Sequence, residues 1–168
     1  MRAIDVRDLL ECSGSSRTVH LEEPVPGLRT ELADVSEDAP IEGDLTLESV
    51  SEGIYVSGRV QGRYSMRCAR CLKEFAREFD LEMAELVPRE AGPEDDYALA
   101  SDLTLDPEPI VRDVVVLEMP FSPLCRPDCL GLCEICGGDR NLGECPGHEV
   151  TDPRWAGLDA VGLDDEAR

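Results

Sequence analysis

The segment from residue 123 to residue 150 constrains the fold of this chain more than any other part of it. Five of the chain's eight cysteines lie there among glycines, and the apolar residues show almost no periodicity. Such a segment cannot bury a hydrophobic core, so apolar packing does not offset the conformational entropy that it loses on folding. Something else must therefore order it.

All but one of the cysteines are spaced as metal ligands. The pairs are Cys68 and Cys71, Cys125 and Cys129, and Cys133 and Cys136, while Cys145 stands three residues before His148. These seven cysteines and one histidine supply the eight ligands of two closed tetrahedral sites, and spacings of two to four residues are typical of structural zinc. We assign Cys68, Cys71, Cys125 and Cys129 to one site and Cys133, Cys136, Cys145 and His148 to the other. The first site would join the sheet to the C-terminal segment, and the second would close locally on a loop.

Other uses of the cysteines fit the sequence less well than two structural zinc ions. No βαβ pattern surrounds Cys68, as a thioredoxin-like redox pair would require, and His148 and the knuckle glycines favour zinc over an iron–sulfur cluster. Disulfides are uncommon in the reducing compartment that we infer below. Spacing alone leaves open which cysteines share a metal and whether one or two ions bind. Cys12 stands alone and is expected to be a free thiol.

The residues before this segment have the pattern of a small α+β domain. Alternating apolar residues predict a strand near Val19 and Leu21, a hairpin over residues 45–67 that turns at 51–53, and a strand over 74–87, where a helix is the alternative. We expect an α+β fold with a small antiparallel sheet, one or two packed helices and a zinc-knuckle C-terminal segment. The expected division is a core domain over 1–122 and a cysteine-rich segment with its tail over 123–168.

The remaining elements are a helix and several loops. A helix is expected to start near Pro109 with Asp106 as a cap and to end before Pro120, with Ile110, Val114 and Leu117 sharing one face. Residues 34–44 are interpreted as an acidic loop and 88–107 as a loop or lid. After Pro153, a short helix around Trp155, Leu158 and Val161 is expected.

The chain is strongly acidic, with a formal net charge of −21 and a pI near 4.2. Such charge keeps a protein in solution, and it also attracts a basic partner. The N-terminus carries charges every few residues, and no stretch approaches the ~20 apolar residues of a membrane helix. We therefore expect a cytoplasmic protein. Without an H-E-x-x-H motif, a phosphate-binding glycine loop or a G-x-S-x-G motif, the sequence gives no case for an enzyme or a catalytic residue.

One strand nevertheless carries a basic stripe. At a spacing of two, the residues opposite its apolar face include Tyr55, Arg59, Gln61, Arg63 and Arg67, and Arg70 follows within the first knuckle. Arginine beside tyrosine on a flat strand can contact phosphate and stack on an unpaired base, so the candidates for RNA binding are Tyr55, Arg59, Arg63, Arg67 and Arg70. The alternative is an ordinary exposed face whose arginines pair with acids on neighbouring strands.

Several motifs resemble the YceD family of bacteria and plastids. They are Cys68-Ala69-Arg70-Cys71-Leu72, Pro123-Leu124-Cys125 with the run from Asp128 to Gly137, Asn141-Leu142, and Asp152-Pro153-Arg154. The resemblance implies a mixed α+β fold, no established enzymatic activity, and a role in the accumulation, processing or stability of large-subunit (23S) ribosomal RNA. The chain departs from the family pattern at Glu134, at Gly143 and at the Cys145–His148 ending.

Two functional hypotheses follow. The first is a ribosome-biogenesis factor that contacts large-subunit rRNA directly through the arginine stripe. The second is an acidic escort that holds a basic large-subunit ribosomal protein until rRNA displaces it. A zinc- or redox-responsive binding protein is a third possibility. None of them requires a membrane or a small-molecule substrate.

Overall fold

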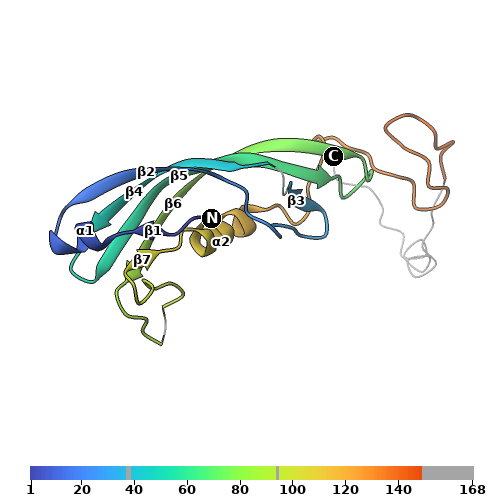
Figure 1. Ribbon diagram of the computed structural model, residues 1–168. Helices are drawn as coiled ribbons and strands as arrows, with labels where there is room; N and C mark the ends of the chain where they lie inside the picture. The colour runs from blue at the N-terminus through green and yellow to red at the C-terminus, as the bar shows by residue number, and fades with distance from the viewer. Residues whose placement is uncertain (37–38, 94, 149–168) are drawn as a thin grey trace, which may run out of the picture.

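The computed structural model describes residues 1–36, 39–93 and 95–148 of the chain. A curved, five-stranded antiparallel sheet dominates these residues (Figure 1). Its strands are β2 (Ser16–Glu23), β3 (Ala33–Val35), β4 (Ile41–Ser49), β5 (Gly53–Arg67) and β6 (Glu74–Pro88). The order is β2-β4-β5-β3, and β6 pairs along the whole opposite side of β5. The predicted hairpin and the strand over 74–87 are both confirmed.

Two helices and a second, two-stranded sheet complete the α+β fold. These elements are β1 (Ile4–Asp5), α1 (Arg7–Glu11), β7 (Thr104–Leu105) and α2 (Glu108–Glu118), and β1 pairs with β7. Helix α2 lies below one face of the large sheet (Figure 1). It begins as predicted, because the Asp106 carboxylate accepts a hydrogen bond of 3.0 Å from the Glu108 N–H, although the backbone cap is Pro107.

Two predicted loops contain strands. The expected acidic loop over 34–44 is too long, because β3 ends at Val35 and β4 begins at Ile41. Likewise, the expected loop over 88–107 includes β7, whose pairing with β1 is a long-range contact that local composition does not reveal. The helix expected after Pro153 lies outside the described residues.

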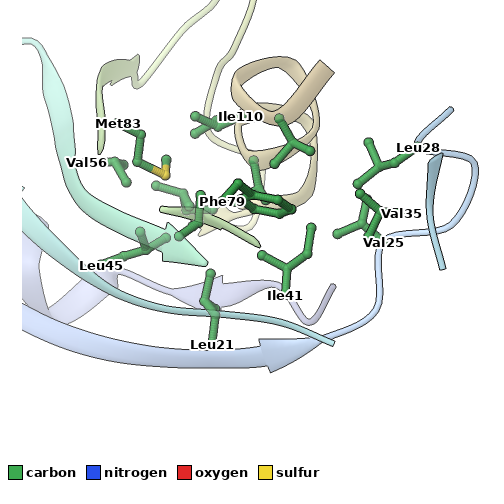
Figure 2. Close-up of a cluster of buried hydrophobic side chains, with 14 of the residues drawn as sticks. Leu21, Val25, Leu28, Val35, Ile41, Leu45, Val56, Phe79, Met83 and Ile110 are labelled. Carbon is green, nitrogen blue, oxygen red and sulfur yellow. The ribbon is translucent and has the colours of Figure 1, made fainter. Parts of the chain in front are cut away.

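The core fills the space between the sheet and α2 and is mostly aliphatic (Figure 2). Val56 and Met83 face the helix from β5 and β6, and Ile110 faces them from α2. The Tyr64 and Phe79 rings pack with centroids 4.4 Å apart, and the Tyr64 hydroxyl donates a hydrogen bond of 3.1 Å to the Val115 carbonyl. This bond ties the strand to the helix and satisfies a buried hydroxyl, which would be costly to leave unpaired.

The buried stripe of α2 differs from the predicted one. Ile110, Val111 and Val115 are buried, whereas Leu117 is 80% exposed. The helix presents the side between Ile110 and Val115 to the sheet, so Leu117 falls at the edge of the contact, in the last turn. The face that Ile110, Val114 and Leu117 share is thus only partly covered, because Val114 packs against the core while Leu117 stays exposed.

Two alanine substitutions test this orientation of α2. Ile110→Ala removes a fully buried side chain and should lower the free energy of unfolding by about 2–4 kcal/mol. Leu117→Ala should change it by less than about 0.5 kcal/mol, because the side chain is already exposed. Urea denaturation of both variants measures this, and similar losses in both would contradict the observed rotation of the helix.

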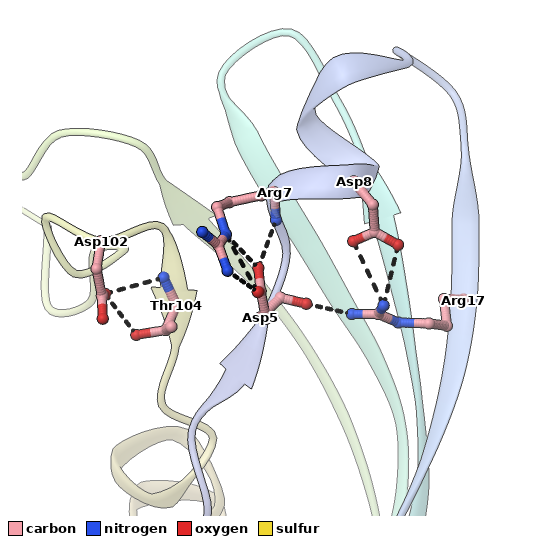
Figure 3. Close-up of polar contacts among 6 residues, drawn as sticks. All are labelled: Asp5, Arg7, Asp8, Arg17, Asp102 and Thr104. Atoms are coloured by element: carbon pink, nitrogen blue, oxygen red, sulfur yellow. Dashed lines mark hydrogen bonds and ion pairs between the residues drawn. The ribbon is translucent and has the colours of Figure 1, made fainter.

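Polar contacts hold the N-terminal elements against the sheet (Figure 3). The Arg17 guanidinium on β2 donates to the Asp8 carboxylate of α1 and to the Asp5 carbonyl of β1. Arg7 pairs with Asp5 beside it, which lowers the pKa of the Asp5 carboxyl to about 2. Among residues 1–36, 39–93 and 95–148, no helix is long and apolar enough to cross a membrane.

Candidate metal centres and the open face of the sheet

Four cysteines converge at the end of the β5–β6 hairpin. They are Cys68, Cys71, Cys125 and Cys129, and their sulfur atoms all lie within 4.8 Å of one another. The Sγ atoms of Cys68 and Cys129 are 3.8 Å apart, and those of Cys71 and Cys125 are 3.7 Å apart. A tetrahedron with zinc–sulfur bonds of about 2.3 Å has edges of about 3.8 Å. The spacing of the sulfurs therefore fits one tetrahedral zinc ion.

The knuckle that carries Cys68 and Cys71 is itself the turn between β5 and β6. The Cys68 N–H donates to the Lys73 carbonyl at 2.9 Å, and Leu72 adopts a positive φ of 60° to close the turn. Backbone hydrogen bonds hold the segment with Cys125 and Cys129 against this turn. They run from the Ala69 N–H to the Pro123 carbonyl and from the Leu132 N–H to the Arg70 carbonyl. Two segments that are far apart in the sequence thus share one site.

Gly131 permits this close approach. It has a φ of +75°, and a Cβ atom there would lie 3.0 Å from the Arg70 carbonyl oxygen. Any other residue would be strained by the backbone conformation and crowded against the first knuckle. The close packing of the two segments therefore requires glycine at position 131.

The first cluster favours a bound cation electrostatically. Burial alone would raise the pKa of the Cys68 thiol. Hydrogen bonds from the backbone N–H groups of Cys125, Cys71 and Arg70 outweigh this effect and lower the pKa to about 6. Burial, followed by the neighbouring thiols, raises the pKa of Cys125 to about 12. Four thiolates so close together repel one another, and a divalent metal ion offsets that repulsion.

A shell of polar residues supports the first cluster. The buried Asp139 carboxylate pairs with the Lys73 ammonium at 2.9 Å and accepts hydrogen bonds from the Asn141 backbone and amide. The Asn141 amide in turn contacts the Cys129 sulfur at 3.6 Å, and its oxygen accepts from the Leu130 N–H at 2.8 Å. Hydrogen bonds of this kind orient metal ligands.

Asp139 and Lys73 were not predicted as supporting residues from the sequence. Both are charged residues among many, and only the fold brings the knuckle after β5 beside residue 139. Asn141 was singled out through the family resemblance alone, without a role.

The second cluster is local and more exposed. Cys133, Cys136, Cys145 and His148 have ligand atoms within 4.8 Å of one another, with Cys136 and His148 on the surface. Gly137 adopts a φ of +71°, and its N–H donates to the Cys133 carbonyl at 2.8 Å, which closes the C-x2-C turn. The backbone N–H groups of Cys136 and Ile135 lower the pKa of the Cys133 thiol to about 7.

Both groupings are the ones expected from the spacing. Three thiolates with one imidazole, and four thiolates, are donor sets typical of structural zinc.

A substitution in the second cluster separates the two sites. Cys136→Ser should lower zinc content from two ions to one, because a soft thiolate is lost from a closed site. Thermal unfolding of the sheet should shift less than on loss of the first site, since all ligands of this cluster come from one loop, which contacts the sheet region through Asp139 and its ion pair with Lys73. Metal analysis beside thermal unfolding tests this, and a loss of both zinc ions would contradict the independence of the clusters.

The candidate RNA-binding residues lie on the face of the sheet that points away from α2, here called the open face. Tyr55, Arg59, Arg63 and Arg67 are exposed along β5. Arg59 pairs with Glu82 and, at 3.7 Å, with Asp80, and Arg67 lies 3.6 Å from Glu74. Arg70 stands apart from this row, because its guanidinium donates to the Cys129 carbonyl at 2.8 Å.

Acidic residues flank the arginine row on both sides. Directly paired residues of neighbouring strands share a face, so the register places the side chains of β4 and β6 beside those of β5. The exposed acids of the open face are Glu22, Asp34, Glu42, Asp44, Glu48, Glu74, Glu78, Asp80 and Glu82. The face also carries His20, which is paired with Asp44. Its acids outnumber its three arginines, so its net charge is negative.

Comparisons with known proteins agree with the sequence motifs. The family model described as "Large ribosomal RNA subunit accumulation protein YceD" matches residues 56–161. Uncharacterized proteins of Mycobacterium tuberculosis and Mycobacterium bovis are 42% identical to this chain over 136 residues, which is 76% of this chain and 65% of theirs. An uncharacterized protein of Mycobacterium leprae is 34% identical over 149 residues, covering 83% of this chain and 69% of its own.

This chain therefore spans about 65% of the length of the first two relatives. No solved structure matches it. The family model covers more than half of the chain, and its match includes both cysteine clusters and most of the β5–β6 hairpin. The chain belongs to the YceD family of large ribosomal RNA subunit accumulation proteins.

Proposed function

We propose that this protein supports the accumulation of large-subunit ribosomal RNA, and that it does so by binding a cationic protein of the large subunit. The observation that carries this proposal is the charge of the open face. Its arginines lie between two rows of exposed acids, and Arg59 and Arg67 are paired with acids of β6. A polyanion such as RNA would meet net repulsion there, whereas a basic ribosomal protein would be attracted.

The cysteine clusters serve this function as structural zinc sites. Zinc held by Cys68, Cys71, Cys125 and Cys129 would fix the end of the β5–β6 hairpin and dock the C-terminal segment on it. Zinc held by Cys133, Cys136, Cys145 and His148 would order a loop that has little apolar core of its own. Both donor sets are complete with protein ligands, and a closed site of this kind leaves no position for a substrate.

Direct contact with rRNA is the second candidate. It is favoured by Arg63, which lies opposite Glu78 but forms no ion pair with it within the described part of the chain, and by Tyr55, which is 38% exposed. In this mode, Tyr55, Arg59, Arg63 and Arg67 would contact phosphates and an unpaired base, with Arg70 beside them. Binding would then weaken steeply with added salt.

Crosslinking in living cells tests the proposal. RNA and proteins attached to this chain are identified, and the crosslinked peptides are mapped. Crosslinks from a basic large-subunit ribosomal protein to β4 and β6 are the expected result. Crosslinks from rRNA to residues 55–70, without such a protein, would replace the escort function with direct RNA contact.

A further inference from the structure

The outer edge of β6 has no strand beside it. In residues 1–36, 39–93 and 95–148, β6 pairs only with β5, and no backbone group from Glu74 to Val87 has a main-chain hydrogen bond outside that pair. In an antiparallel strand, alternate residues direct both N–H and C=O away from the partner. A strand of 15 residues therefore offers a long row of free donors and acceptors.

A groove lined by three apolar and three acidic residues lies beside this edge. Leu81 of β6 and Val114 and Leu117 of α2 line it, and Asp80, Glu82 and Glu118 form its rim. Leu117 is 80% exposed, and Phe121, just beyond the end of α2, is 90% exposed. Exposed apolar residues with a charged rim are typical of an interaction site.

The acidic residues of the groove indicate what kind of segment can bind there. Arg59 pairs with both Asp80 and Glu82 of β6, so these two acids and Glu118 of α2 leave the rim with more negative than positive charge. Charged residues on an edge strand discourage pairing with a like-charged strand, which disfavours a second copy of this chain. Residues 149–168, in which acids also outnumber arginines, are disfavoured for the same reason. The rim instead complements lysine and arginine.

We propose that the β6 edge and this groove bind an extended cationic segment of a partner protein, which adds to the sheet as a further strand. Side chains of an added strand alternate between the two faces. Its apolar residues would contact Leu81, Val114 and Leu117, while its basic residues would lie beside Asp80 and Glu82. The inference deepens the proposed function, on which it rests, by naming a further contact site at the edge of the sheet and the sequence pattern of the cationic partner.

A capped peptide of eight alternating lysines and valines is the probe, and fluorescence anisotropy at low salt gives its dissociation constant. Two further peptides carry N-methyl groups on one or the other set of alternate residues, which removes donors without changing charge. Strand addition predicts that at least one of them binds at least about tenfold more weakly than the unmethylated peptide.

Leu117→Arg tests the groove, since it adds positive charge and removes an exposed apolar contact without disturbing the core. It should weaken binding of the unmethylated peptide at least about tenfold. Leu142→Arg is the matched control, because Leu142 is exposed in the cysteine-rich segment and is neither a metal ligand nor next to one, and it should leave binding unchanged.

Equal binding of all three peptides would overturn strand addition, and unchanged binding to Leu117→Arg would overturn the groove as the site. A dimer in sedimentation that Leu117→Arg dissociates would assign the edge to a second copy and likewise overturn the proposal. None of these results decides whether a basic ribosomal protein binds the open face. The proposed binding of a basic ribosomal protein is rejected by a different result, namely that purified large-subunit ribosomal proteins form no complex with the chain at low salt.

Discussion

Cys71→Ser should remove one of two zinc ions and destabilise the junction between the sheet and the C-terminal segment. The serine oxygen is a poor substitute for a thiolate, and the first site takes all of its ligands from two distant segments. Loss of a structural metal is among the most destabilising effects of a single substitution and lowers the free energy of unfolding by about 4 kcal/mol or more. For a domain of this size that corresponds to a fall in Tm of roughly 8–16 °C.

Metal analysis and thermal unfolding of Cys71→Ser measure both effects. The matched control is Cys12→Ser, because Cys12 is exposed and belongs to neither cluster. The control should keep two zinc ions and the original Tm. Unchanged zinc content in Cys71→Ser would reject the grouping of Cys68, Cys71, Cys125 and Cys129, whatever the change in stability.

The two cysteine clusters place different demands on the fold. The first joins the turn after β5 to residues 123–132, so its loss should be felt in the sheet. The second takes its ligands from residues 133–148 alone, so its loss should be felt first in that loop and only secondarily, through Asp139 and Asn141, at the first site. Comparison of Cys71→Ser with Cys136→Ser therefore separates a metal that anchors the tertiary structure from one that shapes a loop.

The cysteine groupings could be predicted from the sequence because metal ligands obey short-range rules. Two ligands from one turn must be two to four residues apart, and eight ligands fill two sites. The β4–β5 hairpin could also be predicted, because apolar residues alternate along 54–66 and a turn at 51–53 precedes them, whereas the strand that became β6 kept a helix as its alternative. The spacing within each cysteine pair is local information, whereas the sharing of one site by Cys68–Cys71 and Cys125–Cys129 is a long-range contact that spacing alone left open.

The missed features depend on long-range contacts. The pairing of β1 with β7 joins residues about a hundred positions apart, and the ion pair of Lys73 with Asp139 joins two knuckles. The exposed position of Leu117 depends on how α2 rotates against the sheet. The arginine stripe was visible in the sequence, but the rows of acids beside it depend on the register between strands.

Charge reversal on β4 should move the affinities for a basic protein and for RNA in opposite directions. The triple variant Glu42→Lys, Asp44→Lys and Glu48→Lys changes exposed residues of the open face that lie away from the β6 groove. Each exposed pair of charges contributes about 0.2–1 kcal/mol. Three reversals should therefore weaken binding of purified basic large-subunit ribosomal proteins by roughly three- to a hundredfold.

A control with the same change in net charge carries Glu11→Lys, Glu90→Lys and Asp96→Lys, which lie outside the large sheet. It should change both affinities much less than the β4 variant, because screened charges act over about 10 Å. Filter binding of a large-subunit rRNA fragment, measured beside protein binding, completes the test. If the open face is an escort surface, the β4 variant loses the basic protein and gains weak affinity for RNA. If instead the wild-type chain already binds the fragment and the β4 variant keeps its affinity for basic proteins, the arginine row contacts RNA directly and the acids serve only to hold it in place.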